Sequence, residues 1–301
     1  MNMLLVTRNS KTVRLSVVLA TRNEENNIGA CLESVKGIAD EIIVVDEYSS
    51  DKTREIAKGF GAKVFLEPHH NIFHVTKQKA LEKATGDWVL QLDADERVTP
   101  ILAQEIIKVI NMSSIELGKR QNRDVKKDRL FKTHQKLIEE RDGKLGKQTG
   151  GIMAFFIPRL NFFLGKPLIH AGVYPDGVIR LLKRGKAHFP QESVHEQIKI
   201  DGEVGWLYSN LEHHDSPTLK RYFDRMNRYT DLHANELTKS KVRKNPLVFF
   251  YYSFVLPLTV FLKLYIRHKG FMDGVNGFLW SFLSAWHYPI AYFKYWFPKK
   301  E

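Results

Sequence analysis

The chain has 301 residues, 43% of them hydrophobic and 12% aromatic, which is enough apolar material for one substantial core and an appendage. Its single cysteine, Cys31, excludes an internal disulfide framework and favours a reducing compartment such as the cytoplasm. The net charge of +12 gathers near the C-terminus, where residues 239–301 hold ten Lys and Arg against two acidic residues, so an anionic partner is expected there.

The N-terminal part of the chain is predicted to be an α/β domain. Residues 4–6 form an apolar run that is too short for a secretory signal. Farther on, short apolar runs alternate with helical stretches, which is typical of a mostly parallel sheet covered by helices. The expected strands are 15–20, 41–46, 63–66 and 88–92. The expected helix starts are Asn26 or Asn27 for a helix to about Val35, residues 49–51 for one ending near Gly59, and Thr99-Pro100 for a third.

The middle of the chain contains two segments that differ in amino-acid composition. Residues 112–150 are polar and rich in Lys and Arg, and we interpret them as an insertion or mobile loop with a helical piece at 130–140. Interleaved acids and the lack of stacking aromatics argue against a nucleic-acid partner. Beyond this segment, 152–159 and 177–183 are expected strands, and functional residues are expected in the His- and acid-rich stretch 188–215.

Two long apolar and aromatic stretches, 246–266 and 275–293, end the chain with basic residues on their flanks. They are open to three interpretations: membrane spans, helices lying in the membrane interface, or core helices. Pro257 and Lys263 interrupt the first stretch, and polar residues interrupt the second, so neither is a clean span. The mixture of aromatic and basic residues favours helices at the level of the lipid headgroups. We therefore divide the chain into an α/β domain, 1–235, which includes the segment 112–150, and a membrane-associating helical region, 236–301.

Acidic side chains follow two of the expected strands. Asp46 closes the strand 41–46, and Asp93-Ala-Asp95 closes the strand 88–92. Open α/β sheets bind ligands at the carboxyl ends of their strands. A carboxylate there can accept hydrogen bonds from a ribose or base, and two carboxylates across a tight turn can hold Mg²⁺ or Mn²⁺ beside a diphosphate.

These acidic motifs belong to a longer pattern. It comprises Leu15-Ser-Val-Val-Leu-Ala-Thr-Arg-Asn-Glu-Glu-Asn26, Asp46 with Ser49, Asp51 and Thr53, and Gly86-Asp-Trp-Val-Leu-Gln-Leu-Asp-Ala-Asp-Glu-Arg-Val-Thr-Pro100. In order and spacing this pattern resembles family 2 glycosyltransferases. Within the family the chain looks most like the lipopolysaccharide core β-1,4-glucosyltransferase group. That likeness rests on His170-Ala-Gly172, Tyr174-Pro-Asp176, Val194-His-Glu196, Leu211-Glu-His213 and Gly270-Phe-Met-Asp-Gly274.

The resemblance implies a GT-A fold, single displacement with inversion, and a set of site residues. The nucleotide-binding residues would be Thr21, Asn23, Glu25 and Asp46, with Asp93 facing the ribose or metal and Asp95 binding Mg²⁺ or Mn²⁺. His213 or His214 would complete the metal shell or contact the diphosphate, unless both are ordinary surface or packing residues. Arg180 is preferred to Arg159 for gripping the diphosphate, although strand-end arginines also form structural ion pairs.

A carboxylate must deprotonate the acceptor hydroxyl, and the candidates are Glu196, which we prefer, and Asp176. One departure from the family pattern is Asp46-Glu-Tyr-Ser-Ser-Asp51, which puts Tyr48 where relatives commonly have glycine. Tyr48 is expected either to stack on the base or to change which nucleotide is accepted.

The expected activity is transfer of a hexose, with UDP-glucose as the first donor to test, to a saccharide of a lipid-linked glycoconjugate such as lipopolysaccharide core. It would take place at the cytoplasmic face of the inner membrane through peripheral or re-entrant association. The alternatives are a polyprenyl-phosphate acceptor, a different nucleotide sugar, or a non-catalytic nucleotide-binding membrane scaffold. The pattern does not predict an oligomeric state.

Overall fold

The computed structural model describes residues 13–70, 72–120, 125–146, 151–190 and 197–298. The chain forms two compact units. The first comprises Met1–Arg159 and Pro175–His213, and the second comprises Leu160–Tyr174 and His214–Glu301. Residues 160–174 and 214–235, which the sequence analysis assigned to the domain 1–235, thus belong to the second unit.

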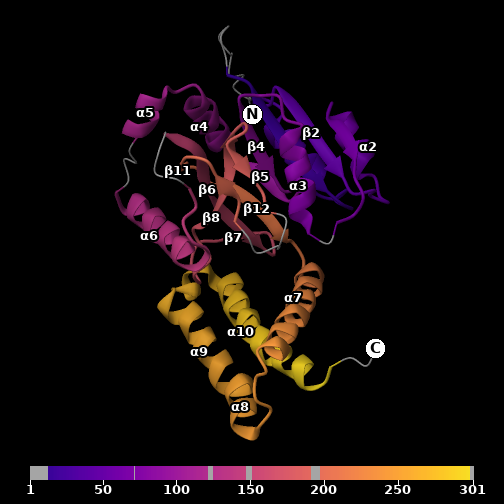
Figure 1. Cartoon of the computed structure of the whole chain (residues 1–301). Coiled ribbons are helices and arrows are strands. Elements are labelled where there is room, and N and C mark those ends of the chain that lie inside the picture. The colour runs from indigo at the N-terminus through magenta and orange to yellow at the C-terminus, as the bar shows by residue number, and fades with distance from the viewer. Residues whose placement is uncertain (1–12, 71, 121–124, 147–150, 191–196, 299–301) are drawn as a thin grey trace. The chain divides into compact units, whose positions relative to one another are not determined.

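The first unit is built on a mixed sheet with the strand order β3-β2-β1-β4-β8-β6-β12-β5 (Figure 1). The four parallel strands are β1 (Leu15–Thr21), β2 (Glu41–Asp46), β3 (Lys63–Leu66) and β4 (Trp88–Leu92). The other strands of this order are β5 (Glu96–Val98), β6 (Ile152–Phe163), β8 (Asp176–Lys183) and β12 (Leu211–Ser216). β8 runs antiparallel to β4 and β6, and β5 runs antiparallel to β12. The predicted mostly parallel sheet is confirmed at the N-terminal end of the chain.

Strand β1 is buried on both faces, which explains its nearly continuous apolar sequence. One face packs with α1 (Ile28–Val35) and α4 (Pro100–Ile110), and α3 (Phe73–Glu82) packs on β1, β2 and β4. Helix α1 buries residues spaced as one helical face: Ile28, Cys31, Leu32 and Val35. The remaining short helix of this region is α2 (Thr53–Gly59).

The expected helix starts are confirmed in part. Thr99 caps α4, because its side chain accepts a hydrogen bond from the backbone N–H of Leu102. Asn27 occupies the N-cap position of α1 but makes no capping hydrogen bond, and its amide donates instead to Glu24 at 2.7 Å.

The segment interpreted as an insertion or mobile loop carries two helices, α5 (Ser114–Lys119) and α6 (Val125–Asp142). The polar sequence of α6 contains two buried residues, Phe131 and Ile138. The ring of Phe131 stacks on Trp206 with 4.5 Å between ring centroids. Trp206 ends β11 (Glu203–Trp206), which pairs with β6, so α6 packs on the sheet of the first unit and contains the helical piece expected at 130–140. A separate two-stranded sheet pairs β9 (Ala187–His188) with β10 (Lys199–Ile200).

The second unit contains β7 (Lys166–Leu168), α7 (Leu219–Lys239) and two C-terminal helical segments. The first segment runs through α8 (Pro246–Phe250), a π-helical turn (Tyr251–Val255), α9 (Leu256–Leu262) and a second π-helical turn (Lys263–Arg267). Pro257 has no N–H and crowds the preceding turn, and the π-helical turn before it accommodates the irregularity. A 3₁₀ turn (Gly270–Asp273) then leads into α10 (Gly274–Trp296), which packs on α7 and α9.

Small residues let the turn and α10 approach closely. A Cβ at Gly277 would lie 1.9 Å from the carbonyl oxygen of Gly270. Among the described residues, the 22-residue segment Pro246–Arg267 is long and apolar enough to cross a membrane by length and composition, and no part of its most apolar window is buried.

Candidate active site

The register of the parallel strands brings Thr21 and Asp46 to one edge of the sheet. Thr21 pairs with Asp46 across β1 and β2, and its hydroxyl donates a 3.0 Å hydrogen bond to the Asp46 carboxylate. The backbone N–H of Ser49 donates to the same carboxylate at 2.8 Å and its hydroxyl at 2.5 Å. Asp46 is completely buried. In this arrangement it organises the loop after β2.

The loops that follow β1 and β2 are joined by reciprocal hydrogen bonds. Asn23 accepts from the N–H of Ser50 at 2.8 Å and donates its own N–H to Ser49 at 2.8 Å. Glu25 likewise accepts from the N–H of Lys52 and donates to Asp51, both at 3.0 Å. These bonds bring together, at one edge of the sheet, the four residues predicted to bind the nucleotide: Thr21, Asn23, Glu25 and Asp46.

Tyr48, in the loop after β2, combines an unusual backbone conformation with an exposed side chain. Its φ is +52°, in the left-handed region that favours glycine, and its side chain is 61% exposed. The ring is thus presented to solvent beside the joined loops, where an aromatic face is available for a base.

Asp93, at the end of β4, lies in a buried network of opposite charges. Lys77 on α3 approaches its carboxylate at 2.7 Å, Arg180 on β8 donates to it, and the amide of Gln91 lies at 3.3 Å. Burial alone would raise the pKa of Asp93, but the charges of Arg180 and Lys77 outweigh burial and hold it well below its usual range. Asp93 is therefore ionised and already bound by two cations.

Arg180 is held from several sides. Besides Asp93 it donates to Glu96 at 2.7 and 3.2 Å and to the side-chain oxygen of Gln91. Glu96 is completely buried and also accepts the backbone N–H of Asp93 at 2.9 Å. The predicted diphosphate-binding arginine is thus part of the network that fixes the Asp93 turn.

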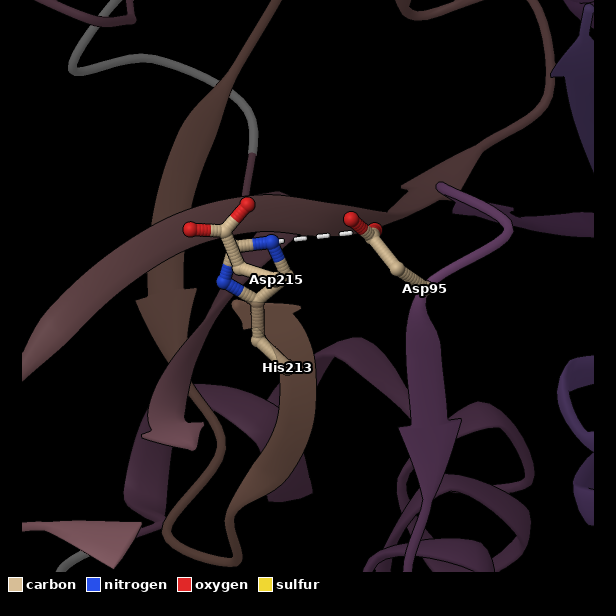
Figure 2. A group of neighbouring side chains, drawn as sticks. All are labelled: Asp95, His213 and Asp215. Atoms are coloured by element: carbon tan, nitrogen blue, oxygen red, sulfur yellow. Dashed lines mark ion pairs between the residues drawn. The ribbon is translucent and has the colours of Figure 1, made fainter. Parts of the chain in front are cut away.

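Asp95 and His213, which the sequence predicts as metal ligands, lie side by side. The Asp95 carboxylate is 3.6 Å from Nε2 of His213 (Figure 2). Burial, with a smaller contribution from the charge of Arg159, lowers the pKa of His213 to about 4, so its imidazole is neutral near pH 7 and keeps a lone pair for a metal.

Asp215 follows His213 by two residues in the continuous strand β12, and side chains at this spacing share a face of a strand. Asp95, His213 and Asp215 each offer a ligand atom, and these atoms lie within 4.8 Å of one another. Two carboxylates and one imidazole suit Mn²⁺, and carboxylates with water suit Mg²⁺. The residues therefore fit the divalent ion that the sequence predicts, although Asp93 does not belong to this group.

Of the two candidate bases, the structure describes the surroundings of Asp176. Asp176, at the start of β8, is held by Arg159 through contacts of 2.9 and 2.6 Å. It must loosen this ion pair to accept a proton. Glu196 lies outside the described residues.

Sequence reasoning missed three residues of the site: Lys77, Glu96 and Asp215. Glu96 directly follows the acidic motif, and Asp215 lies in the His- and acid-rich stretch, so both carried a signal. Lys77 carried none, because it is one of many lysines and only the packing of α3 brings it to Asp93.

A mostly parallel sheet that ends in joined loops, with carboxylates and an imidazole nearby, is consistent with a glycosyltransferase of the GT-A type. The family model for glycosyl transferase family 2 matches residues 16–169, and the chain belongs to this family. The predicted family, enzyme class and fold are confirmed.

The chain is also similar to other glycosyltransferase sequences and to solved structures. The chain is 25% identical over 90% of its length, and 90% of the relative's, to the lipopolysaccharide core biosynthesis glycosyltransferase LpsC of Rhizobium meliloti. It is 26% identical to the uncharacterized glycosyltransferase RT0209 of Rickettsia typhi, over 90% of this chain and 83% of the relative. The glucosyl-3-phosphoglycerate synthase of Mycobacterium tuberculosis, solved with phosphoglyceric acid, is 16% identical over 77% of this chain and 82% of that chain, with a TM-score of 0.43.

Proposed function

We propose that this glycosyltransferase moves a hexose from a nucleotide sugar, with UDP-glucose as the first donor to test, to a saccharide of a lipid-linked glycoconjugate such as lipopolysaccharide core. The observation that carries the proposal is the grouping of Asp95, His213 and Asp215 in the chain of a family 2 glycosyltransferase. The relative LpsC, whose name places it in lipopolysaccharide core biosynthesis, supports this choice of acceptor.

On the donor side, the joined loops hold the nucleotide. Thr21, Asn23 and Glu25 lie on one loop, and Asp46 fixes the other by accepting three hydrogen bonds. Tyr48 stacks on the base, which its exposure and fixed backbone allow. Arg180 and Lys77 add positive charge near the diphosphate while holding Asp93 in place.

On the metal side, Asp95, His213 and Asp215 would hold Mg²⁺ or Mn²⁺. A divalent ion held by these residues would neutralise the charge that develops on the departing nucleoside diphosphate. The burial of His213 keeps its imidazole unprotonated, and Asp95 supplies an oxygen ligand beside it. Asp93 then orients the ribose or completes the ligand set.

A single displacement inverts the anomeric centre and requires one base on the acceptor side. We assign this role to Glu196, with Asp176 as the alternative. Asp176 is anchored by Arg159, an arrangement that suits a positioning group as well as a base.

The acceptor side is proposed to lie against the cytoplasmic face of the inner membrane, with the second unit as the attachment. The segment Pro246–Arg267 exposes large apolar side chains, and α10 exposes others. They include Leu247, Phe250, Phe254, Leu258, Leu262, Ile266, Phe278, Phe282 and Trp286. Flanking basic residues would meet anionic headgroups. The same surface suits a polyprenyl-phosphate acceptor, which remains the second candidate, as does a different nucleotide sugar.

The test is a donor survey with purified protein in Mn²⁺ or Mg²⁺. UDP-, GDP- and dTDP-sugars are offered separately, with and without membrane lipid extract, and release of nucleoside diphosphate is followed. The proposal predicts release from one donor, stimulated by the extract and lost on chelation. Failure of every donor to bind or react would contradict the proposal and favour the alternative of a non-catalytic membrane scaffold.

A further inference from the structure

A pocket lies entirely within the second unit, between α7, α10 and the end of β12. It has a volume of about 270 Å³, close to the lower end of the ~300–1,000 Å³ range of small-molecule sites. Among the residues that line it are Tyr222 and Tyr229 on α7 and Trp280 and Tyr288 on α10. We propose that this pocket binds one sugar ring of the acceptor, which deepens the proposed function and rests on it.

The first argument is the aromatic wall. Tyr222 and Trp280 meet edge to face, with 6.1 Å between ring centroids and 66° between planes. Tyr222 also meets the ring of Phe163 at 5.2 Å, so this part of the wall is fixed by packing. Tyr229, in contrast, is 44% exposed at the mouth. Rigid, amphipathic rings present flat faces to the C–H groups of a pyranose and place phenol oxygens near its hydroxyls.

The second argument is the charge balance of the lining. Asp215 and Arg225 both line the pocket and form an ion pair with each other. The guanidinium of Arg225 also lies 5.7 Å from the centre of the Tyr229 ring. His287 shares a 3.1 Å hydrogen bond with His233. The pocket therefore offers paired charges and hydrogen-bonding groups rather than a cationic surface, which favours a neutral polyhydroxylated ring over a phosphate.

The third argument is the position of Asp215 along the chain. This residue lines the pocket and also belongs to the ligand group with His213, two residues earlier on β12. Asp215 and Ser216 both line the pocket, so its wall includes the end of the strand that carries His213.

The test is saturation-transfer NMR on the full chain, with methyl β-D-glucopyranoside and a methyl heptopyranoside as probes. Three variants perturb the pocket: Trp280→Ala removes one wall, Tyr229→Ala removes the exposed rim, and Ser284→Phe fills the space. Trp286→Ala is the matched control, because Trp286 is 47% exposed on the same helix and does not line the pocket.

The proposal predicts transfer to the C–H protons of at least one glycoside in the wild type and in Trp286→Ala. The signal is lost in Tyr229→Ala and in Ser284→Phe, and in Trp280→Ala if this variant folds. In the transferase assay, Tyr229→Ala raises the KM for the acceptor about tenfold. No glycoside signal in the wild type, an unchanged signal in Tyr229→Ala and Ser284→Phe, or displacement by inorganic phosphate would each overturn it. A wild type that binds glycosides but releases no nucleoside diphosphate would instead count against the proposed function.

Discussion

Replacing Arg180 with methionine tests the buried charge network that fixes the Asp93 turn. The Arg180 side chain is 7% exposed and binds Glu96, Gln91 and Asp93, so its removal leaves two carboxylates short of a cation. Breaking a buried ion pair by removing one partner costs about 3–5 kcal/mol. For a protein of this size, that loss lowers Tm by roughly 10 °C.

The matched control is Arg141→Met. Arg141 pairs with Asp142 at 2.7 Å, but its side chain is 68% exposed. A surface pair of this kind contributes about 0–1 kcal/mol, so the control is expected to unfold almost as the wild type does. Urea unfolding followed by circular dichroism, in buffer containing chelator, measures both variants.

The pH dependence gives a second readout of the same network. In the wild type the folded-state pKa of Asp93 is depressed, because Arg180 and Lys77 outweigh burial. This carboxylate therefore stabilises the fold above its unfolded pKa and loses that contribution as the pH falls through its folded pKa. Without Arg180, burial has a larger effect on the pKa of Asp93, so this carboxylate accepts a proton at a higher pH in the variant than in the wild type. Protonation removes the cost of the buried charge, and it does so in the variant first. The difference between wild type and Arg180→Met should be largest near pH ~7 and should shrink toward pH ~4. A difference below about 1 kcal/mol, or one that grows on acidification, would refute this reasoning.

Three further substitutions probe separate parts of the account. Tyr48→Asn should keep the left-handed backbone, raise Tm slightly and weaken donor binding measured by calorimetry; unchanged affinity would remove the stacking role. Leu258→Glu should reduce pelleting with anionic vesicles, whereas Leu137→Glu should not, because Leu137 lies on α6 and is 60% exposed against 58% for Leu258; equal pelleting would place the attachment elsewhere. Glu196→Gln should abolish transfer while donor binding persists, and a larger loss in Asp176→Asn would reverse the assignment of the base.

The sequence predicted most of the parallel sheet, because β1, β2 and β4 are buried almost throughout and read as short apolar runs. It did not single out α3 or α7. Helix α3 buries Thr76, Lys77 and Ala80, so its contacts leave no apolar period to recognise. Helix α6 has a polar sequence and is nevertheless docked, because its buried Phe131 stacks on Trp206.

The candidate site was predictable where it follows strand ends. Asp46, Asp93 and Asp95 were found because strand ends collect ligand-binding groups. Their partners depend on packing between distant segments: Lys77 reaches Asp93 through α3, and Arg180 reaches it through β8. The pairing of β12 with β5 places His213 opposite Glu96, one residue from Asp95. Such pairings have no local signal in a single sequence.

The most direct test of the central claim compares Asp95→Asn with Asp201→Asn, a control whose carboxylate is 56% exposed and pairs with Lys186. Mn²⁺ binding is measured by calorimetry, and release of nucleoside diphosphate is measured with the donor that the survey identifies. The account predicts that Asp95→Asn folds normally, loses tight Mn²⁺ binding and slows release by about 100-fold, while Asp201→Asn behaves as the wild type. Wild-type Mn²⁺ affinity and release in Asp95→Asn would contradict the assignment of Asp95, His213 and Asp215 as the metal-binding group.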